Sequence, residues 1–265
     1  PGHRASLEAT LIARRDGAVR VAVYNPLAQT LSTVLSLPVN QAQGLTLTDS
    51  KGAKVTTTVV EAPHPVTNYE PDNRAVAAPY AMYFAAELPP LSLTTYTLTS
   101  AKDVAHVAAT PPTRAEVAAT PSSDGVRPDA AVTLSNGHIT LSFDGATGAL
   151  ISMKNDESGV STPLTLTPLS YKPHVKKKSG HGSDQPSGAY IFRPNASASL
   201  AAGAAPIHFE YKPADGQSKA VQYVRQSWAP WLNISIYLKD GARHAEVVVT
   251  AGALPQATEL IVRLA

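Results

Sequence analysis

Apolar and polar residues alternate with a period of two along most of the chain, a pattern typical of half-buried β-strands. β-Branched and aromatic residues are common in these segments, as they are in strands generally. In the first hundred residues the alternation predicts strands at 20–24, 31–38, 45–48, 54–60, 81–85 and 91–98. Only residues 5–15 have a pattern that is also compatible with a helix.

Turn-forming residues separate these segments. The stretch from Asp49 to Gly52 lies between two predicted strands, and Gly supplies the positive φ that a tight hairpin needs. Asn25-Pro26 is a turn initiator at the end of the first strand. These features predict an antiparallel sheet with one solvated face.

A second set of alternating segments follows residue 131. Strands are predicted at 132–134, 139–143, 149–153, 207–211, 221–224, 232–238, 245–249 and 260–262. Turns at 144–148 and 239–241 again place Gly where the chain reverses. Strands at this spacing, without intervening helices, predict an all-β chain with antiparallel strands packed as sandwiches.

The composition changes between residues 101 and 131. Ala, Pro, Thr and Ser dominate, and the sequence VAATP occurs twice. Such a segment buries too little apolar surface to offset the entropy of ordering it, so we expect an extended linker. The predicted organisation is a lead-in segment at 1–16, a small β-domain at 17–100, an Ala/Pro-rich linker at 101–131 and the first part of a large β-sandwich at 132–265.

Charge and composition exclude several classes of protein. The 265 residues include 22 Lys and Arg and 20 Asp and Glu, a net charge of +2, so we expect no nucleic-acid surface. The basic run Lys176–Lys178 is interpreted as a solvated loop rather than a phosphate site. No apolar run approaches the roughly 20 residues that cross a bilayer. The absence of cysteine excludes disulfides and cysteine-based sites within the chain.

Both ends of the sequence suggest a piece of a longer protein. The chain begins at Pro1 without an initiator Met or a signal peptide, and it stops at Ala265 directly after a predicted strand. A sandwich that ends there leaves an edge strand without a neighbour. We therefore expect either further residues on another chain or a partner that covers this edge.

No set of residues forms a convincing catalytic or metal site. His181, Ser183 and Asp184 are close in sequence, but the members of a hydrolytic triad converge through the fold. The eight histidines are scattered singly, whereas zinc sites need clustered ligands. We interpret these histidines as surface or partly buried structural residues.

A glycosidase needs two carboxylates about 5–10 Å apart. Asp144 and Asp240 lie in turns, where their side chains are expected to cap the backbone. Glu210 and Glu246 alternate with apolar neighbours, as solvent-facing residues do. The residues alone therefore indicate a β-rich accessory piece and not a complete active site.

Two N-x-S/T sequons make Asn195 and Asn233 candidate glycosylation sites. In a chain so rich in Ser and Thr, about one or two such sequons arise by chance. They favour a protein of the secretory pathway only mildly.

The stretch SDQPSGAYIFRP at 183–194 is unusual for a routine strand. Three small residues, 187–189, precede Tyr190, which suggests that a bulky group comes close to this backbone. The alternative is an ordinary strand tyrosine with a packed ring and a solvated hydroxyl.

Five stretches share a known pattern. They are VAVYNPLAQTLSTVLSLPV at 21–39, AELPPLSLTTYTL at 86–98, NGHITLSFDGATGALISMKN at 136–155, SDQPSGAYIFRPN at 183–195 and GARHAEVVVTAGALP at 241–255. In this order they resemble the β-domains of glycoside hydrolase family 38 α-mannosidases, and the fourth is closest to the lysosomal and vacuolar branch. The stretches cover nearly the whole chain, whereas the linker is matched poorly.

The resemblance implies a retaining exo-α-mannosidase whose N-terminal barrel carries the nucleophilic Asp and a zinc ion. None of those motifs is present, so zinc is expected in a partner catalytic domain, and no catalytic or metal residue is expected in this chain. The resemblance also implies a galactose-mutarotase-like sandwich from which the tyrosine of the S-G-A-Y run enters the sugar pocket. Tyr190 matches that tyrosine, whereas Pro186 and the missing continuation after Ala265 depart from the family pattern.

The leading hypothesis is thus a β-portion of an α-mannosidase that works with a barrel-bearing chain of the same precursor. It would act on mannose-containing glycans in a multi-chain assembly or homo-oligomer, in a lysosome or vacuole or after secretion. Two other hypotheses stay open. One is a stand-alone carbohydrate-binding or adhesive β-sandwich, and the other is an enzyme homologue that has lost activity.

Overall fold

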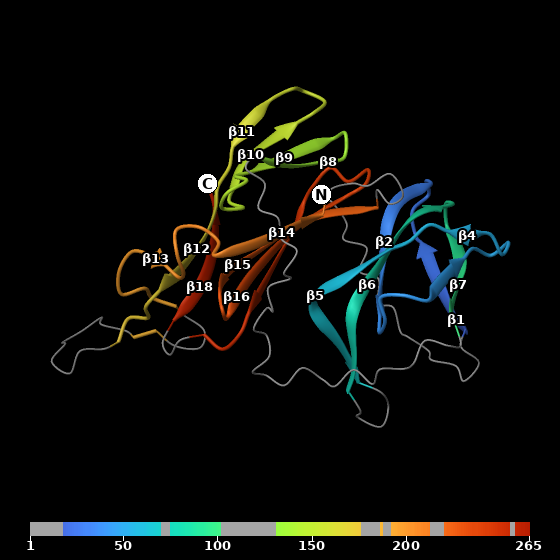
Figure 1. Ribbon diagram of the computed structural model, residues 1–265, viewed down its shortest axis with the longest axis horizontal. Coiled ribbons are helices and arrows are strands. Elements are labelled where there is room, and N and C mark those ends of the chain that lie inside the picture. Colours follow the sequence, from blue (N-terminus) through green and yellow to red (C-terminus); the bar gives the residue numbers. More distant parts are fainter. Residues whose placement is uncertain are drawn as a thin grey trace. The chain divides into compact units, whose positions relative to one another are not determined.

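The structure is a computed structural model that describes residues 18–69, 75–101, 131–175, 186–187, 192–212, 220–254 and 258–265; of 63–69 and 75–77 it describes the backbone alone. Every regular element in these ranges is a β-strand (Figure 1), so the all-β prediction is confirmed. The lead-in segment 1–16 with its possible helix, residues 102–130 of the predicted linker, and Tyr190 lie outside the described residues.

Contacts within the chain define two compact units. The first comprises Pro1–Thr113, Ala214–Gln222 and Tyr237–Ala245. The second comprises Arg114–Pro213, Tyr223–Ile236 and Glu246–Ala265. The predicted domain boundaries stay predictions.

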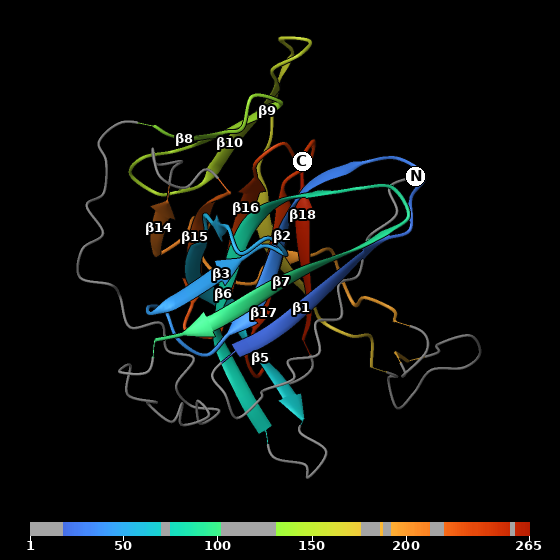
Figure 2. The same ribbon diagram turned by 90° about the vertical axis from the view of Figure 1, so that its right-hand side faces the viewer.

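Two antiparallel sheets make up most of the first unit, with strand orders β1-β7-β3-β4 and β2-β6-β5. Their strands are β1 Ala18–Asn25, β2 Leu31–Val39, β3 Leu45–Thr48, β4 Lys54–Val55, β5 Thr58–Tyr69, β6 Ala75–Leu88 and β7 Ser92–Ser100. Figure 2 shows β1 beside β7, and their register runs from Ala18 opposite Thr99 to Asn25 opposite Ser92.

Alternation along these strands directs one set of side chains from both sheets into a shared core. Its buried members are Val23, Leu35, Leu37, Val39, Leu47, Met82, Phe84, Ala86, Leu88, Tyr96 and Leu98. Phe84 of one sheet meets Tyr96 of the other in an edge-to-face arrangement, with ring centroids 5.0 Å apart. The first unit is therefore a sandwich, because a single core joins the two sheets.

The prediction of one strand at 54–60 is wrong, because the structure divides it between the two sheets. In β4, Val55 lies opposite Leu47 of β3. In β5, Thr58 lies opposite Tyr83 of β6. The chain changes sheets over Thr56 and Thr57, and the local alternation carries no information about which neighbour a strand pairs with.

The turn after β1 is held from inside by the side chain of Asn25, which is 0% exposed. Its Nδ2 donates to the backbone oxygens of Gln29, Leu88 and Pro89 at 2.9, 3.0 and 2.9 Å. Its Oδ1 accepts a hydrogen bond from the Leu27 N–H at 3.0 Å. The predicted turn is confirmed, and the same amide also holds the end of β6.

The strands after residue 131 form three sheets, with orders β11-β10-β9-β8, β13-β12-β18 and β14-β15-β16-β17. They are β8 Val132–Ser135, β9 Ile139–Phe143, β10 Leu150–Asn155, β11 Ser161–Pro163, β12 Leu166–Tyr171, β13 Ser199–Leu200, β14 His208–Lys212, β15 Val221–Ala229, β16 Leu232–Lys239, β17 Glu246–Ala251 and β18 Glu259–Leu264. Three of them, β11, β12 and β13, were not predicted.

The turn between β9 and β10 is packed tightly inside the second unit. Gly148 has φ +72°, and the position that a Cβ atom would occupy lies 2.3 Å from the ring of Phe209. The Gly148 carbonyl accepts a hydrogen bond from Nε2 of the buried Gln226 at 2.7 Å, and Gln226 Oε1 accepts from Trp228 Nε1 at 3.0 Å. The glycine therefore meets both a backbone and a packing requirement.

Asp144 caps the same turn, as predicted. Its Oδ1 accepts hydrogen bonds from Oγ1 and from the backbone N–H of Thr147, both at 2.7 Å. Donation by the Thr147 hydroxyl, and then by its backbone N–H, lowers the pKa of Asp144 below its ordinary value. The folded state consequently binds fewer protons at this carboxylate than the unfolded state does.

Because the pKa of Asp144 is lowered in the folded state, the ionised carboxylate stabilises the fold. We therefore expect Asp144→Ala to lower the free energy of unfolding at pH 7. The difference in free energy of unfolding between the parent and the variant should shrink as the pH falls below about 4, because Asp144 of the parent then becomes protonated. Urea unfolding at pH 7, 5 and 3 measures the difference. Thr147→Val removes the main donor and should show the same pH dependence. A loss of equal size at all three pH values would contradict the assignment.

Candidate functional site

Much of the stretch that the sequence singled out lies outside the described residues. This applies to Tyr190 and to the other candidates near it, His181, Ser183, Asp184 and Lys176–Lys178. The structure does describe the residues that flank Tyr190, which are Pro186 and Ser187 before it and residues 192–195 after it. These flanking residues form the frame of the candidate site.

The segment after the tyrosine returns along the segment that follows β12. Pro194 forms an isolated antiparallel bridge with Pro173. The His174 N–H donates to the Arg193 carbonyl at 2.7 Å, and the Asn195 N–H donates to the Lys172 carbonyl at 2.8 Å. These bonds extend the antiparallel pairing beyond the regular strand.

Ser187 joins the two flanks of the stretch. Its backbone N–H donates to the His174 carbonyl at 3.0 Å. Its hydroxyl donates to the Arg193 carbonyl at 2.7 Å and accepts from the Arg193 N–H at 2.9 Å. One side chain thus makes both hydrogen bonds that a neighbouring strand would make, and it fixes the two ends of the segment 188–192.

Two side-chain contacts attach this frame to the sheet β13-β12-β18. Phe192 packs against Tyr171, the last residue of β12, with ring centroids 5.9 Å apart. Lys172 Nζ donates to Oγ1 of Thr258, directly before β18, at 3.0 Å. The frame is consequently anchored on both neighbouring strands β12 and β18.

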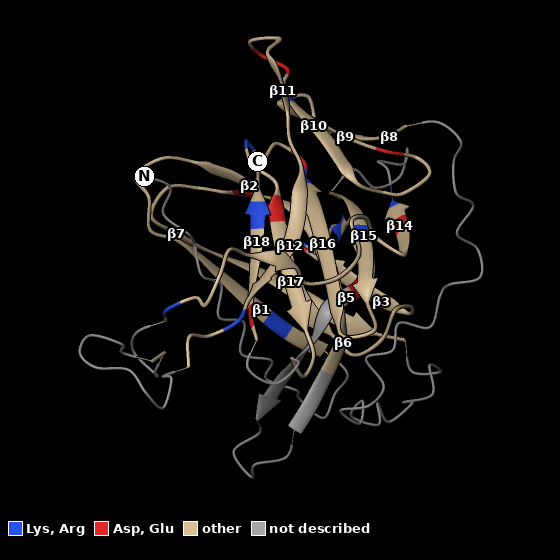
Figure 3. Ribbon diagram, turned by 90° about the vertical axis from the view of Figure 1, so that its left-hand side faces the viewer, with Lys and Arg blue, Asp and Glu red and all other residues tan. Residues whose placement is uncertain are grey.

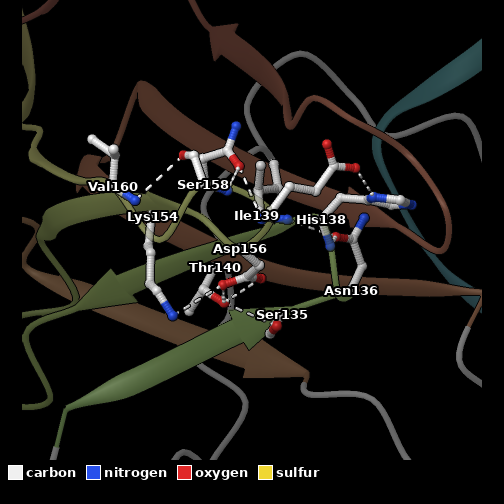
Figure 4. A network of polar contacts seen from close by, with 11 residues as sticks. Ser135, Asn136, His138, Ile139, Thr140, Lys154, Asp156, Ser158 and Val160 are labelled. Atoms are coloured by element: carbon white, nitrogen blue, oxygen red, sulfur yellow. Dashed lines mark hydrogen bonds and ion pairs between the residues drawn. The ribbon is translucent and has the colours of Figure 1, made fainter.

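A second group of polar side chains lies on β8, β9 and β10, in the turn between β8 and β9 and in the turn between β10 and β11 (Figure 4). Asn136 Oδ1 accepts hydrogen bonds from the N–H groups of His138 and Ile139, both at 3.1 Å. His138 Nδ1 lies 3.0 Å from Glu157 Oε1. These contacts close the turn between β8 and β9 and connect it to the end of β10.

Asp156 occupies the centre of this polar group (Figure 4). The Thr140 hydroxyl lies 2.9 and 3.1 Å from its two carboxylate oxygens, and Lys154 Nζ lies 3.5 Å from one of them. Both carboxylates of the group, Asp156 and Glu157, are hydrogen-bonded to side chains of the same hairpins. This arrangement indicates a role in fixing the hairpins rather than in catalysis.

Glu210, predicted to face solvent, forms an ion pair on the outer face. Its side chain is 34% exposed, and its Oε1 accepts a hydrogen bond from Arg225 Nη1 at 3.0 Å. Glu210 and Arg225 lie directly opposite each other on β14 and β15. Arg225 also lies 4.6 Å from the centroid of the Tyr223 ring. Period-two alternation identified the outer face but not this cross-strand pair.

Charged residues are few and spread out on the strands seen in Figure 3. Among the residues that the structure describes, no three His, Asp or Glu side chains are grouped so that they could hold a metal ion. No helix in the same part of the chain is long and apolar enough to cross a membrane.

The two sequons have different surroundings. Asn195 and Ser197 are exposed, in a stretch without regular strand structure. Asn233 is half-buried within β16, between the buried Leu232 and Ile234, and Ser235 is buried too. Of the two asparagines, Asn195 is the more accessible in the folded chain.

Comparison with known proteins identifies relatives over most of the chain. The chain is 30% identical over 237 residues to the lysosomal α-mannosidase of Homo sapiens, which covers 89% of this chain. It is 29% identical over 252 residues to the α-mannosidase of Canavalia ensiformis, which covers 91%. These matches confirm the resemblance to α-mannosidases that the motifs predicted. No model of a protein family matches the chain.

The chain spans about a fifth of the length of these relatives, 21% of the human enzyme and 23% of the plant enzyme. Among solved structures, it is similar to a glycosyl hydrolase family 38 protein from Enterococcus faecalis, with a TM-score of 0.44 and 12% identity. That similarity covers 92% of this chain and 32% of the bacterial protein.

Proposed function

We propose that the chain is the β-domain portion of a retaining family 38 exo-α-mannosidase that hydrolyses terminal α-linked mannose in glycans. In this proposal the nucleophilic Asp and the zinc ion belong to a catalytic part outside these 265 residues, either on the same polypeptide or on another chain of the same precursor. A lysosomal, vacuolar or secreted location is part of the proposal, because the matched relatives include lysosomal enzymes.

One observation carries the proposal. The similarity to lysosomal α-mannosidase extends over 89% of this chain yet over only 21% of the human enzyme. A β-rich piece of this size, in which the sequence offers no convincing pair of carboxylates, is expected to support a reaction centre located elsewhere. Retaining glycoside hydrolysis proceeds through a covalent glycosyl-enzyme intermediate. No step of it is assigned to the described residues.

The contribution proposed for this chain is the phenol of Tyr190. A neutral tyrosine hydroxyl can both donate and accept hydrogen bonds, so it can orient a mannose hydroxyl or a catalytic carboxylate without transferring a proton. Ser187 and Arg193, which are bonded to each other on either side of Tyr190, support this role because they hold together the described residues that flank it. The tyrosine would act as a positioning residue.

We expect Tyr190→Phe in the full-length protein to lower kcat/KM for a chromogenic α-mannoside by about 10- to 100-fold, the effect of losing one hydrogen bond to a polar partner. Folding should be unaffected, since the ring is kept. Tyr211→Phe, which changes an exposed tyrosine of β14, is the matched control and should leave the kinetics unchanged. An equal kcat/KM for the parent and for Tyr190→Phe would contradict a role of Tyr190 in the sugar pocket.

Two measurements separate this proposal from its alternatives. Hydrolysis of the α-mannoside by the full-length protein, and loss of hydrolysis with a chelator, are expected of a zinc-dependent mannosidase. Glycan binding without hydrolysis would instead favour a carbohydrate-binding or adhesive sandwich. A protein that retains zinc but hydrolyses no mannoside would be a homologue without activity.

The proposal of a secretory-pathway protein also predicts which sequon is used. In a eukaryotic host we expect N-glycosylation at Asn195, which is exposed, and none at Asn233, whose side chain is half-buried within β16. Asn195→Gln should abolish the mass shift that an N-glycosidase removes, whereas Asn233→Gln should leave it unchanged. Loss of the shift in Asn233→Gln alone would contradict the prediction.

A further inference from the structure

Four large apolar side chains are exposed together on the first unit, at the end where β1 finishes and β7 begins. Leu91 and Leu93 are each 64% exposed, Tyr24 is 60% exposed and Leu27 is 36% exposed. Tyr24 and Leu93 lie directly opposite each other in the register of β1 and β7. The Leu91 N–H donates to the Leu27 carbonyl at 2.9 Å. These four residues are called the Leu91 patch.

The backbone at the centre of the patch is strained. Among the residues that the structure describes, Leu91 is the one non-glycine residue with positive φ, at 48°. This left-handed region is favoured by Gly and tolerated by Asn, and it is unfavourable for a bulky side chain. Pro90 precedes Leu91 in the turn, an arrangement in which the next position usually carries Gly or Asn. A leucine here is unfavourable for the backbone and, because it is exposed, unfavourable for solvation.

The patch is also held rigidly from beneath. The buried Asn25 amide donates to the carbonyls of Leu88 and Pro89, and the Ser92 hydroxyl donates to the Pro89 carbonyl at 2.7 Å. The turn therefore cannot relax easily to withdraw Leu91 from water. Residues kept in strained backbone conformations by surrounding structure are found mainly at functional positions, and exposed groups of apolar side chains mark interaction surfaces.

We propose that the Leu91 patch is the surface on which the remainder of the full-length mannosidase polypeptide packs. The chain spans only 21% of the human relative's length, so a protein built like that relative carries most of its mass outside these residues. All four side chains of the patch are uncharged, and three are aliphatic, which suits an apolar protein surface better than a glycan. This inference rests on the part of the proposed function that makes the chain one portion of a longer enzyme.

Hydroxyl-radical footprinting tests the inference independently of enzyme activity. We expect Tyr24, Leu91 and Leu93 to be modified at least about fivefold more slowly in the full-length protein than in the 265-residue chain, because packing removes them from solvent. Val160, exposed on the second unit, serves as the internal reference. Equal modification of the patch in both proteins would overturn the inference.

Protection that is already present in the 265-residue chain would also overturn it. If that protection disappeared on dilution, the occupant would be a second copy of the chain. If it persisted, the occupant would be residues of the same chain. A full-length protein without mannosidase activity but with a protected patch would reject the proposed function and leave the surface assignment standing.

A single variant separates the packing role from a stability role. Leu91→Asn places a residue that tolerates the left-handed backbone, so the melting temperature of the 265-residue chain should stay within about 2 °C of the parent value or rise. In the full-length protein the same variant should raise the modification rate of Tyr24 by at least about twofold, whereas Val160→Asn should not. A full-length variant in which Tyr24 stays fully protected would contradict the role of Leu91.

Discussion

Gly148→Ala is expected to destabilise the second unit by about 2–5 kcal/mol, the sum of left-handed backbone strain and overpacking. The added Cβ would lie 2.3 Å from the Phe209 ring, and φ is +72°. Phe209 is buried and cannot move aside freely. The Gly148 carbonyl is also bonded to Gln226, so a shift of the turn would disturb a buried hydrogen bond. Urea unfolding followed by tryptophan fluorescence measures the effect, because both tryptophans belong to the second unit.

A matched glycine separates the two causes. Gly137 also has positive φ, +83°, but nothing lies within 4 Å of its Cβ position. Gly137→Ala should therefore cost only the backbone strain, about 1–2 kcal/mol. In a Phe209→Ala background, Gly148→Ala should lose most of its packing cost, which a double-mutant cycle reports as coupling. Equal losses for the two glycine variants would show that the contact with Phe209 is unimportant.

The second large effect is expected for Asn25→Ala in the first unit. The substitution removes a fully buried amide and leaves the Leu88 carbonyl and the Leu27 N–H without their side-chain partner. We expect a loss of about 3–4 kcal/mol, since each buried polar group left unsatisfied costs about 1–3 kcal/mol. The first unit contains neither tryptophan. Far-UV circular dichroism should therefore show an earlier transition while the tryptophan transition stays close to that of the parent.

Two further variants define the cause at Asn25. Asn40→Ala, at an exposed position just after β2, should change stability by less than about 0.5 kcal/mol. Asn25→Asp keeps the size and one acceptor but cannot donate when ionised, and it buries a charge, so it should be at least as damaging as Ala near pH 7. If Asn25→Asp were as stable as the parent at that pH, the hydrogen bonds that Asn25 Nδ2 donates to the three carbonyls would contribute little to stability.

Local sequence was sufficient for the features that depend on one turn or one strand. Gly52 and Gly241 were expected where the chain reverses, and both have positive φ, +82° and +65°. The cap formed by Asp144 was also expected, since a carboxylate in a turn accepts hydrogen bonds from nearby backbone N–H groups. Such features need only neighbouring residues, so a single sequence contains the information.

Features that join distant parts of the chain could not be predicted in this way. β12 was missed because Pro168 interrupts its pattern, and proline is unusual inside a sheet. The structure accommodates it because β13 pairs with β12 only at Leu169 and Ser170. The contact between Gln226 and Gly148 spans 78 residues, and no periodicity indicates it.

The candidate site was predictable only through the resemblance. The residues around Tyr190 suggested a close approach to the backbone but not what approaches. The hydroxyl of Ser187, which bonds to both backbone groups of Arg193, was missed because serine is common in this chain and its partner lies six residues away. A serine three residues before an unusual aromatic is a weak signal without the fold.

The passage of the chain between the two sheets of the first unit leaves almost no spare length. Val55 is paired in one sheet and Thr58 in the other, so only Thr56 and Thr57 bridge the sandwich. An inserted residue there cannot bulge outward without pulling one strand out of register, whereas the exposed hairpin at 50–53 has room for one. Loop grafting and length variation in proteins of this kind should therefore be accepted at the hairpin and rejected three residues later.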